Sequence, residues 1–156
     1  MQIRYTAMPT EIARAYQTGA PDAYGNPPER QIADDGGYQC RHCLTIIPPG
    51  DEMLLVAYRP FEALDAYAET GPVFVCAKAC EGFGTRAETP ATLQASPDFL
   101  LKGYGANDRI VYGTGAVTEA ADVANRAAEV FANPDVAYIH VRSSRNNCYQ
   151  ARIDRG

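Results

Sequence analysis

Two close pairs of cysteines, Cys40-x2-Cys43 and Cys76-x3-Cys80, constrain this sequence more than any other feature. They account for four of its five cysteines. A structural zinc site takes four sulfur or nitrogen ligands in a tetrahedron, and two close pairs from separate turns commonly supply them. The spacing therefore predicts a metal site at Cys40, Cys43, Cys76 and Cys80, with zinc as the expected ion. A chain that forms this site must fold so that its two pairs meet.

Two other interpretations of the cysteine pairs stay open. Buried cysteines often behave as small apolar side chains, and Cys76, at the end of an apolar run, is the clearest candidate for that role. A redox pair would instead open a helix, whose N-terminus stabilises a thiolate. The residues after Cys43, from Leu44 to Ile47 and then Pro-Pro-Gly, leave no room for such a helix. We expect His42, inside the first pair, to point away from a metal held by its neighbours or to replace one of them.

Composition limits the other classes of function. The chain has 156 residues, enough for one domain with a hydrophobic core. Its net charge of −5 disfavours a general binder of nucleic acid or anionic membranes, because both need a positive field. No apolar run approaches the roughly 20 residues that span a bilayer, and the N-terminus lacks the pattern of a secretory signal. We therefore expect a cytoplasmic protein with no nucleic-acid or membrane partner.

Hydrophobic patterning predicts an α+β fold with a mainly antiparallel sheet and one principal helix near the C-terminus. We expect a single domain over residues 1–156, in which residues 1–37 are an irregular lead-in and residues 38–155 form the core. The lead-in holds a short strand at residues 2–6, a brief helix from Thr10, and a loop-like stretch over 18–37. The other expected elements are strands at 52–58, 73–77, 99–104 and 109–113, and a helix at 119–132 capped by Thr118.

The chain is expected to close with a β-hairpin over residues 136–142 and 148–154. Side chains alternate between the two faces of a strand, so one face of this hairpin is apolar and the other is polar. The polar face holds His140, Arg142, Cys148, Gln150 and Arg152. A loop at residues 143–147 would place His140 opposite Gln150 and Arg142 opposite Cys148.

This polar face favours either of two functions. His140, Arg142 and Arg152 could bind a small anionic ligand or a protein partner, which would make the protein a zinc-stabilised binding module. Alternatively, Cys43 or Cys148 could act as a nucleophile with His140 as its base, in a thiol-dependent enzyme. A solvated, arginine-rich edge without a ligand is the third interpretation. The sequence identifies no further residue of a catalytic triad, so the binding module is the leading hypothesis.

Several motifs in chain order resemble the bacterial "domain of unknown function 1203" family. They are C-R-H-C-L from residue 40, L-L-V-A-Y-R-P-F from 54, Y-A-E-T-G-P-V-F-V-C-A-K-A-C from 67, Y-I-H-V-R from 138 and C-Y-Q-A-R-I-D-R from 148. The resemblance covers about residues 38–155. It implies a small α+β domain in a bacterial cytoplasm and brings no established activity.

Two positions depart from the pattern of that family. The positions of Cys76 and Arg142 are often histidine. Exchange of histidine for cysteine at residue 76 suits a zinc ligand, because zinc binds both. Arg142 cannot bind a metal, which argues against a second metal centre on the hairpin.

Overall fold

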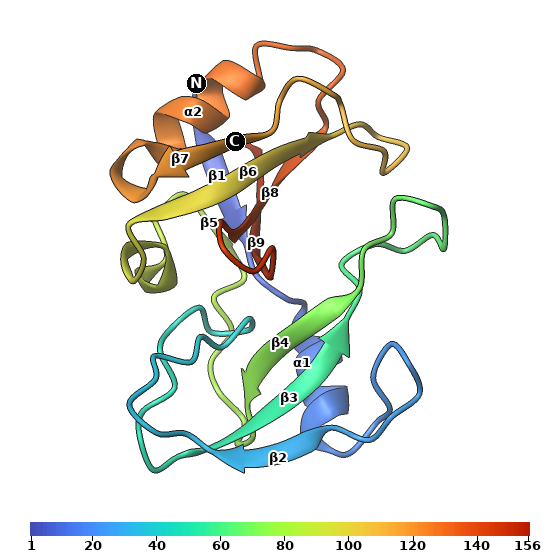
Figure 1. Ribbon diagram of the computed structural model, residues 1–156, viewed down its shortest axis with the longest axis vertical. Helices are drawn as coiled ribbons and strands as arrows, with labels where there is room; N and C mark the ends of the chain where they lie inside the picture. Colours follow the sequence, from blue (N-terminus) through green and yellow to red (C-terminus); the bar gives the residue numbers. More distant parts are fainter.

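Two antiparallel sheets, each with one helix against it, make up the molecule (Figure 1). The structure is a computed structural model that describes residues 1–156. The large sheet has the strand order β5-β1-β9-β8-β6-β7 and the small sheet has the order β2-β3-β4. The strands are β1 (Ile3–Thr6), β2 (Glu29–Ile32), β3 (Glu52–Tyr58), β4 (Gly71–Cys76), β5 (Thr85–Arg86), β6 (Asp98–Tyr104), β7 (Ala116–Glu119), β8 (Tyr138–Ser143) and β9 (Tyr149–Arg155). The helices are α1 (Thr10–Gln17) and α2 (Val123–Val130), with short 3-10 turns η1 (Ala91–Gln94) and η2 (Ala120–Asp122).

The large sheet buries one face beneath α2, as Figure 1 shows. On this face Ile139 lies opposite Ile153 and Val141 lies opposite Ala151, all fully buried. The small side chain of Ala127 lets α2 approach the strands closely, because it adds little bulk at the contact. The α+β class, the mainly antiparallel pairing, the helix near the C-terminus and the closing hairpin predicted from the sequence are all confirmed.

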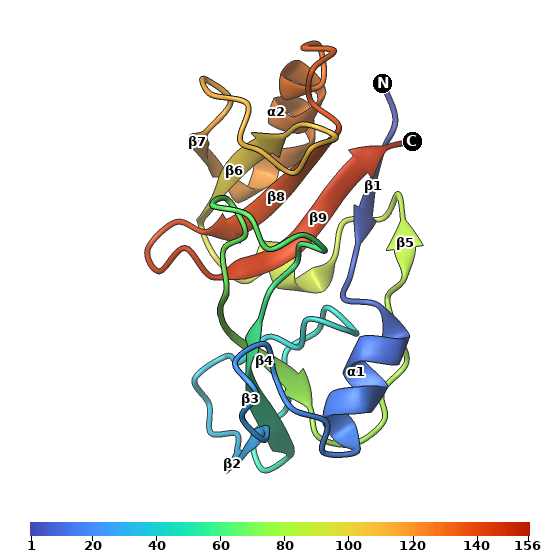
Figure 2. The same cartoon turned by 90° about the vertical axis from the view of Figure 1, so that its right-hand side faces the viewer.

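The connection between β3 and β4 crosses the opposite face of the hairpin (Figure 2), which is therefore not a solvated edge. His140 is 1% exposed and Arg142 is 3% exposed. The predicted register was wrong by two residues, since His140 lies opposite Arg152 instead of Gln150. A bulge after Val141 then places Tyr149, instead of Cys148, opposite Arg142. One extra residue in a strand redirects the side chains that follow it, so Tyr149 joins the polar face.

The small sheet forms as its apolar runs predict. β3 and β4 pair antiparallel from Met53 opposite Cys76 to Tyr58 opposite Gly71. The lead-in also contains ordered elements: the expected strand and helix are present as β1 and α1. Residues 29–32 were predicted to be loop but form β2, which pairs with β3. All four side chains of β2 are exposed, so this edge strand carries no hydrophobic pattern by which the sequence could reveal it.

Two expected elements of the C-terminal half differ from the prediction. Residues 109–113 form only one bridge, from Ile110 to Tyr104, because the left-handed backbone of Asp108 and Gly113 turns the chain at both ends of this stretch. The next strand is β7 instead. Thr118 lies in β7 opposite Phe99, so it does not cap the helix, which begins at Val123. Neither helix of the fold has the length and apolar character needed to cross a bilayer.

Candidate functional site

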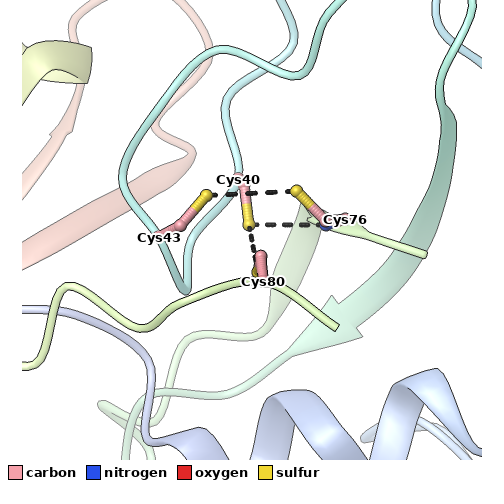
Figure 3. Close-up of side chains that lie close together, drawn as sticks. All are labelled: Cys40, Cys43, Cys76 and Cys80. Atoms are coloured by element: carbon pink, nitrogen blue, oxygen red, sulfur yellow. Dashed lines mark hydrogen bonds between the residues drawn. The ribbon is translucent and has the colours of Figure 1, made fainter. Parts of the chain in front are cut away.

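The four paired cysteines come together at the end of β4 (Figure 3). Their sulfur atoms all lie within 4.8 Å of one another, and Cys40–Cys80 and Cys43–Cys76 are separated by 4.0 and 3.9 Å. A tetrahedron with metal–sulfur bonds of about 2.3 Å has sulfur–sulfur edges of about 3.8 Å. None of these cysteines forms a disulfide. The arrangement therefore has the size and the ligand set to hold one metal ion.

The first pair lies in a tight turn of the chain before β3. The N–H of Leu44 donates to the carbonyl of Cys40, and Gln39 forms a bridge with Ile46. Leu44 has a φ of 54°, the left-handed conformation that glycine usually supplies after the second cysteine of such a turn. That conformation costs a non-glycine residue about 1–2 kcal/mol. The Leu44 side chain is 1% exposed, and its burial offsets the cost.

The second pair is held by α1, a helix for which no role at the cysteines was predicted. Gln17 donates to the carbonyls of Cys76 and Lys78, at 2.9 and 3.1 Å. Arg14 donates to the carbonyl of Cys80 at 2.7 Å. The only sequence signal for these contacts is their spacing of three residues, which puts both side chains on one face of a helix.

His42 supports the cluster from beside it. Its Nδ1 lies 3.1 Å from the sulfur of Cys80, and its Nε2 lies 2.9 Å from the hydroxyl of Thr10. The ring is fully buried, and burial, followed by the charge of Arg14, lowers its pKa. A neutral ring that accepts a hydrogen bond from Thr10 at Nε2 donates its Nδ1–H to sulfur. His42 thus neither points away nor replaces a cysteine.

Gly82 makes room for His42. A Cβ atom at this position would lie 2.6 Å from the Nε2 of His42 and 3.0 Å from the hydroxyl oxygen of Thr10. Both distances are shorter than van der Waals contact, so any side chain here displaces the ring or the helix start. No motif in the sequence marks this requirement.

The four thiols cannot ionise independently at this separation. Hydrogen bonds from Cys40, Cys76 and Cys80 lower the pKa of Cys43. Hydrogen bonds with Cys40 and Cys43 in turn raise the pKa of both Cys76 and Cys80. The hydrogen bond with Cys43 raises the pKa of Cys40, but those with Cys76 and Cys80 bring it down to about 7. Thiolates at Cys43 and Cys40 are thus favoured at the expense of the other two, because several negative charges this close repel one another. A bound cation would relieve that repulsion.

A second candidate site, the inter-sheet cleft, is a cavity of about 740 Å³ between the large sheet and the chain that follows β3. This is a usual volume for a small-molecule site. Its lining includes Arg4 and Thr6 from β1, residues 58–62, Asp108, Tyr138 and His140 from β8, and Tyr149, Arg152, Asp154 and Arg155 from β9. Four arginines face three carboxylates, so the cleft is locally positive in a chain of net charge −5.

His140 lies at the floor of the cleft among aromatic rings. The ring centres of Phe61, Tyr104, Tyr138 and Tyr149 are 4.7–5.2 Å from that of His140. Its Nδ1 lies 3.2 Å from a guanidinium nitrogen of Arg142. Burial, followed by the charges of Arg142, Arg152 and Lys102, holds the pKa of His140 well below its usual value, so the ring is neutral. Its Nε2 is buried and has no hydrogen-bond partner in the protein.

Arg142 does not line the cleft and instead forms an ion pair with Glu69. One nitrogen of its guanidinium lies 2.9 Å from a carboxylate oxygen of Glu69, whose other oxygen lies 2.8 Å from Lys102. The same guanidinium donates to the carbonyl of Asn147. Of the three residues predicted to bind a ligand, the structure thus brings His140 and Arg152 to one cavity and directs Arg142 to an internal ion pair.

The candidate nucleophiles do not meet His140. Cys43 belongs to the thiol cluster, and Cys148 lines two smaller cavities beside the cleft, into which His140 does not project. No hydrogen bond joins either thiol to His140. Arg41, a buried neighbour of Cys40, connects the two sites by donating to the carbonyl of Tyr149. No role was predicted for Arg41.

Comparison with known proteins identifies a family without an assigned activity. No curated protein and no solved structure shows significant similarity to this chain. The family model described as "Protein of unknown function (DUF1203)" matches residues 37–155. These residues include all five cysteines and the whole hairpin, whereas β1 and α1 lie before them. The chain belongs to the DUF1203 family.

Proposed function

We propose that this protein is a small-ligand-binding module whose fold is fastened by a zinc ion at Cys40, Cys43, Cys76 and Cys80. The ligand binds in the inter-sheet cleft. The observation that carries the proposal is His140, a buried side chain at the floor of that cleft whose Nε2 has no partner in the protein. A buried donor without an acceptor costs about 1–3 kcal/mol, which a bound ligand or an ordered water recovers.

Zinc is the ion that best suits four thiol ligands, because sulfur is a soft ligand and zinc accepts tetrahedral geometry without preference. When bound, it would neutralise the thiolates and cross-link the turn before β3 to the end of β4. Four protein ligands leave no position for water, so the centre is structural. Reduced thiols of this kind suit a compartment such as the cytoplasm.

Elemental analysis of the purified full chain tests the metal centre. We expect about one zinc per chain. Thiol titration should detect only Cys148 until a chelator removes the zinc and makes the other four thiols reactive. Cys148→Ser is the matched control and should keep its zinc. A chain without zinc, with five freely reactive thiols, would contradict the metal proposal and favour the thiol-dependent enzyme.

Amide NMR spectra of the zinc-loaded chain test the cleft. A set of small fragments of positive, neutral and negative charge is added one at a time. We expect at least one charge class to shift the amides of Tyr58, Phe61, His140 and Arg152 together. Shifts confined to other surfaces, or none in any class, would contradict a ligand site in the cleft.

A further inference from the structure

The hydrogen-bond pattern of His140 determines which atom a ligand must offer. Arginine has only donors, so the Nδ1 that faces Arg142 must be the acceptor of that contact. In a neutral ring the proton is then on Nε2. The buried, unpartnered atom at the floor of the cleft is thus a hydrogen-bond donor, and it requires an acceptor atom from the ligand.

The charges around the floor favour an acceptor that carries one negative charge. Arg152 lies opposite His140 on the neighbouring strand and uses only its Nε, which donates to Asp154 at 2.7 Å. Arg59 likewise uses only its Nε, for the carbonyl of Phe61. The remaining guanidinium nitrogens of both arginines have no partner in the protein, so they are free to bind an anion.

The carboxylates of the cleft limit the negative charge that a ligand can carry there. Asp154 is occupied by Arg152 and by the hydroxyl of Thr6, and Asp108 accepts from the hydroxyl of Tyr138 at 2.8 Å. Glu62 is exposed and has no ion pair. Four arginines against three carboxylates leave the cleft a formal charge of only +1, which a carboxylate monoanion neutralises and a phosphate dianion would exceed.

The walls determine the shape of the ligand. The rings of Tyr58 and Tyr149 pack edge to face with their centres 5.7 Å apart, and Phe61 lies next to His140, so these rings form one continuous aromatic surface of the cleft. Flat aromatic surfaces stack best on a flat apolar body. Arg152 lies 4.0 Å above the ring of Tyr138, a contact that holds its guanidinium in place.

We propose that the inter-sheet cleft binds a small carboxylate with a flat, mainly apolar body, and that one carboxylate oxygen accepts the Nε2–H of His140 while Arg152 neutralises its charge. This inference rests on the proposed function, because it presumes that the cleft holds a ligand. It adds the chemical class and the orientation, with the carboxylate at the floor and the apolar body against the aromatic surface.

Isothermal titration of the zinc-loaded full chain with benzoate, benzamide and phenyl phosphate tests the proposal, because the three probes share a ring and differ in the polar group. We expect benzoate to bind at least ten-fold more tightly than either of the others. Equal binding of benzamide, or tighter binding of phenyl phosphate, would overturn the carboxylate class while leaving a ligand site in the cleft. Absence of binding by all three would overturn the inference, and the fragment spectra decide separately whether the cleft binds anything.

Variants locate the bound group. Arg152→Gln should weaken benzoate at least ten-fold, because a charge-assisted hydrogen bond is lost. Arg145→Gln removes the same charge from an exposed loop outside the cleft and should leave benzoate binding unchanged. His140→Phe keeps the ring volume and removes the donor, so it should also weaken benzoate. If His140→Phe fails to fold, Arg152→Gln alone still decides, since equal effects of the two arginine variants would overturn the proposal.

Discussion

The metal centre and the inter-sheet cleft draw their residues from the chain in different ways. All four thiols come from residues 40–80, and only the supporting side chains of α1 come from elsewhere. The cleft instead combines β1, the end of β3 and both strands of the hairpin, so its lining runs from Arg4 to Arg155. A site built from nearby turns can be recognised by spacing. A site built where two sheets meet exists only after both have formed.

Loss of a cysteine ligand should have the largest effect on stability. It should unfold the region around the metal centre and leave the large sheet folded. For Cys43→Ser we expect loss of zinc and unfolding of the small sheet, because structural zinc contributes about 10–16 kcal/mol in small zinc domains. Hydrogen exchange should show lost protection in β3 and β4 and retained protection in β6 and β8. Cys148→Ser is the control. Uniform loss across both sheets would show that the two regions do not fold separately.

Removal of Glu69 tests the contact between the regions. Glu69→Gln leaves Arg142 buried at 3% exposure without its anion. We expect a loss of about 1–3 kcal/mol in unfolding free energy, less than for a fully buried pair, because the Glu69 side chain is 35% exposed. Denaturant titration measures it. Glu62→Gln makes the same exchange at an exposed position in the same connection and should change stability by less than about 0.5 kcal/mol. Equal values for the two variants would contradict the prediction.

His42→Ala should lower the zinc affinity of the metal centre without abolishing zinc binding. Residues that orient metal ligands typically contribute 10-fold to 100-fold to metal affinity. Competition with a chromophoric chelator would measure the change, and Gly82→Ala should act in the same direction by displacing the ring. Thr45→Ala, which removes a hydroxyl near Cys43 instead, serves as a comparison. Unchanged zinc affinity in His42→Ala would show that the contact with Cys80 has no role.

Acid should destabilise the region around the cleft through His140. Its pKa is lowered in the folded state, so the unfolded chain binds a proton that the folded chain does not. The stability due to His140 is fully present above the unfolded pKa of about 6.5, and it is lost below that at about 1.4 kcal/mol per pH unit. The charged groups that face the ring are Arg142, Arg152 and Lys102, and all three remain positive over this range.

Denaturant titration between pH 5 and 8 would measure this dependence in the wild type and in His140→Gln. The difference between the two removes the contribution of zinc release, which both share. We expect a flatter profile for the variant below pH about 6.5. Parallel profiles would mean that His140 titrates normally and that the floor of the cleft is open to water.

Much of the fold could be predicted from the sequence, because β3, β4 and β6 contain apolar runs and the hairpin alternates with the period of two of a strand. The errors have local causes. Strand β2 has no buried side chain, so no pattern marks it. Residues 109–113 were predicted to be a strand, but left-handed backbone at Asp108 and Gly113 bends the chain at both ends and leaves a single bridge.

The candidate site could be predicted in part. Spacing alone indicated the four cysteines, but not that His42 would contact Cys80 or that Gly82 would make room for it. His140 and Arg152 were assigned to one face for the right reason, the period of two. The carbonyl of Tyr149 that accepts from Arg41 lies 108 residues away in the chain, and no local pattern links such distant residues.

The sequence by itself determined the family, the α+β class and the four thiols, because each depends on short-range patterns that survive in any arrangement of the elements. Tertiary structure decided the cleft. A bulge after Val141 placed Tyr149 beside His140, and the packing of the β3–β4 connection against the hairpin buried a polar face that could otherwise have been solvated. The physical reason is that burial and an unpartnered donor are properties of a side chain's surroundings, which form only when segments distant in the chain meet.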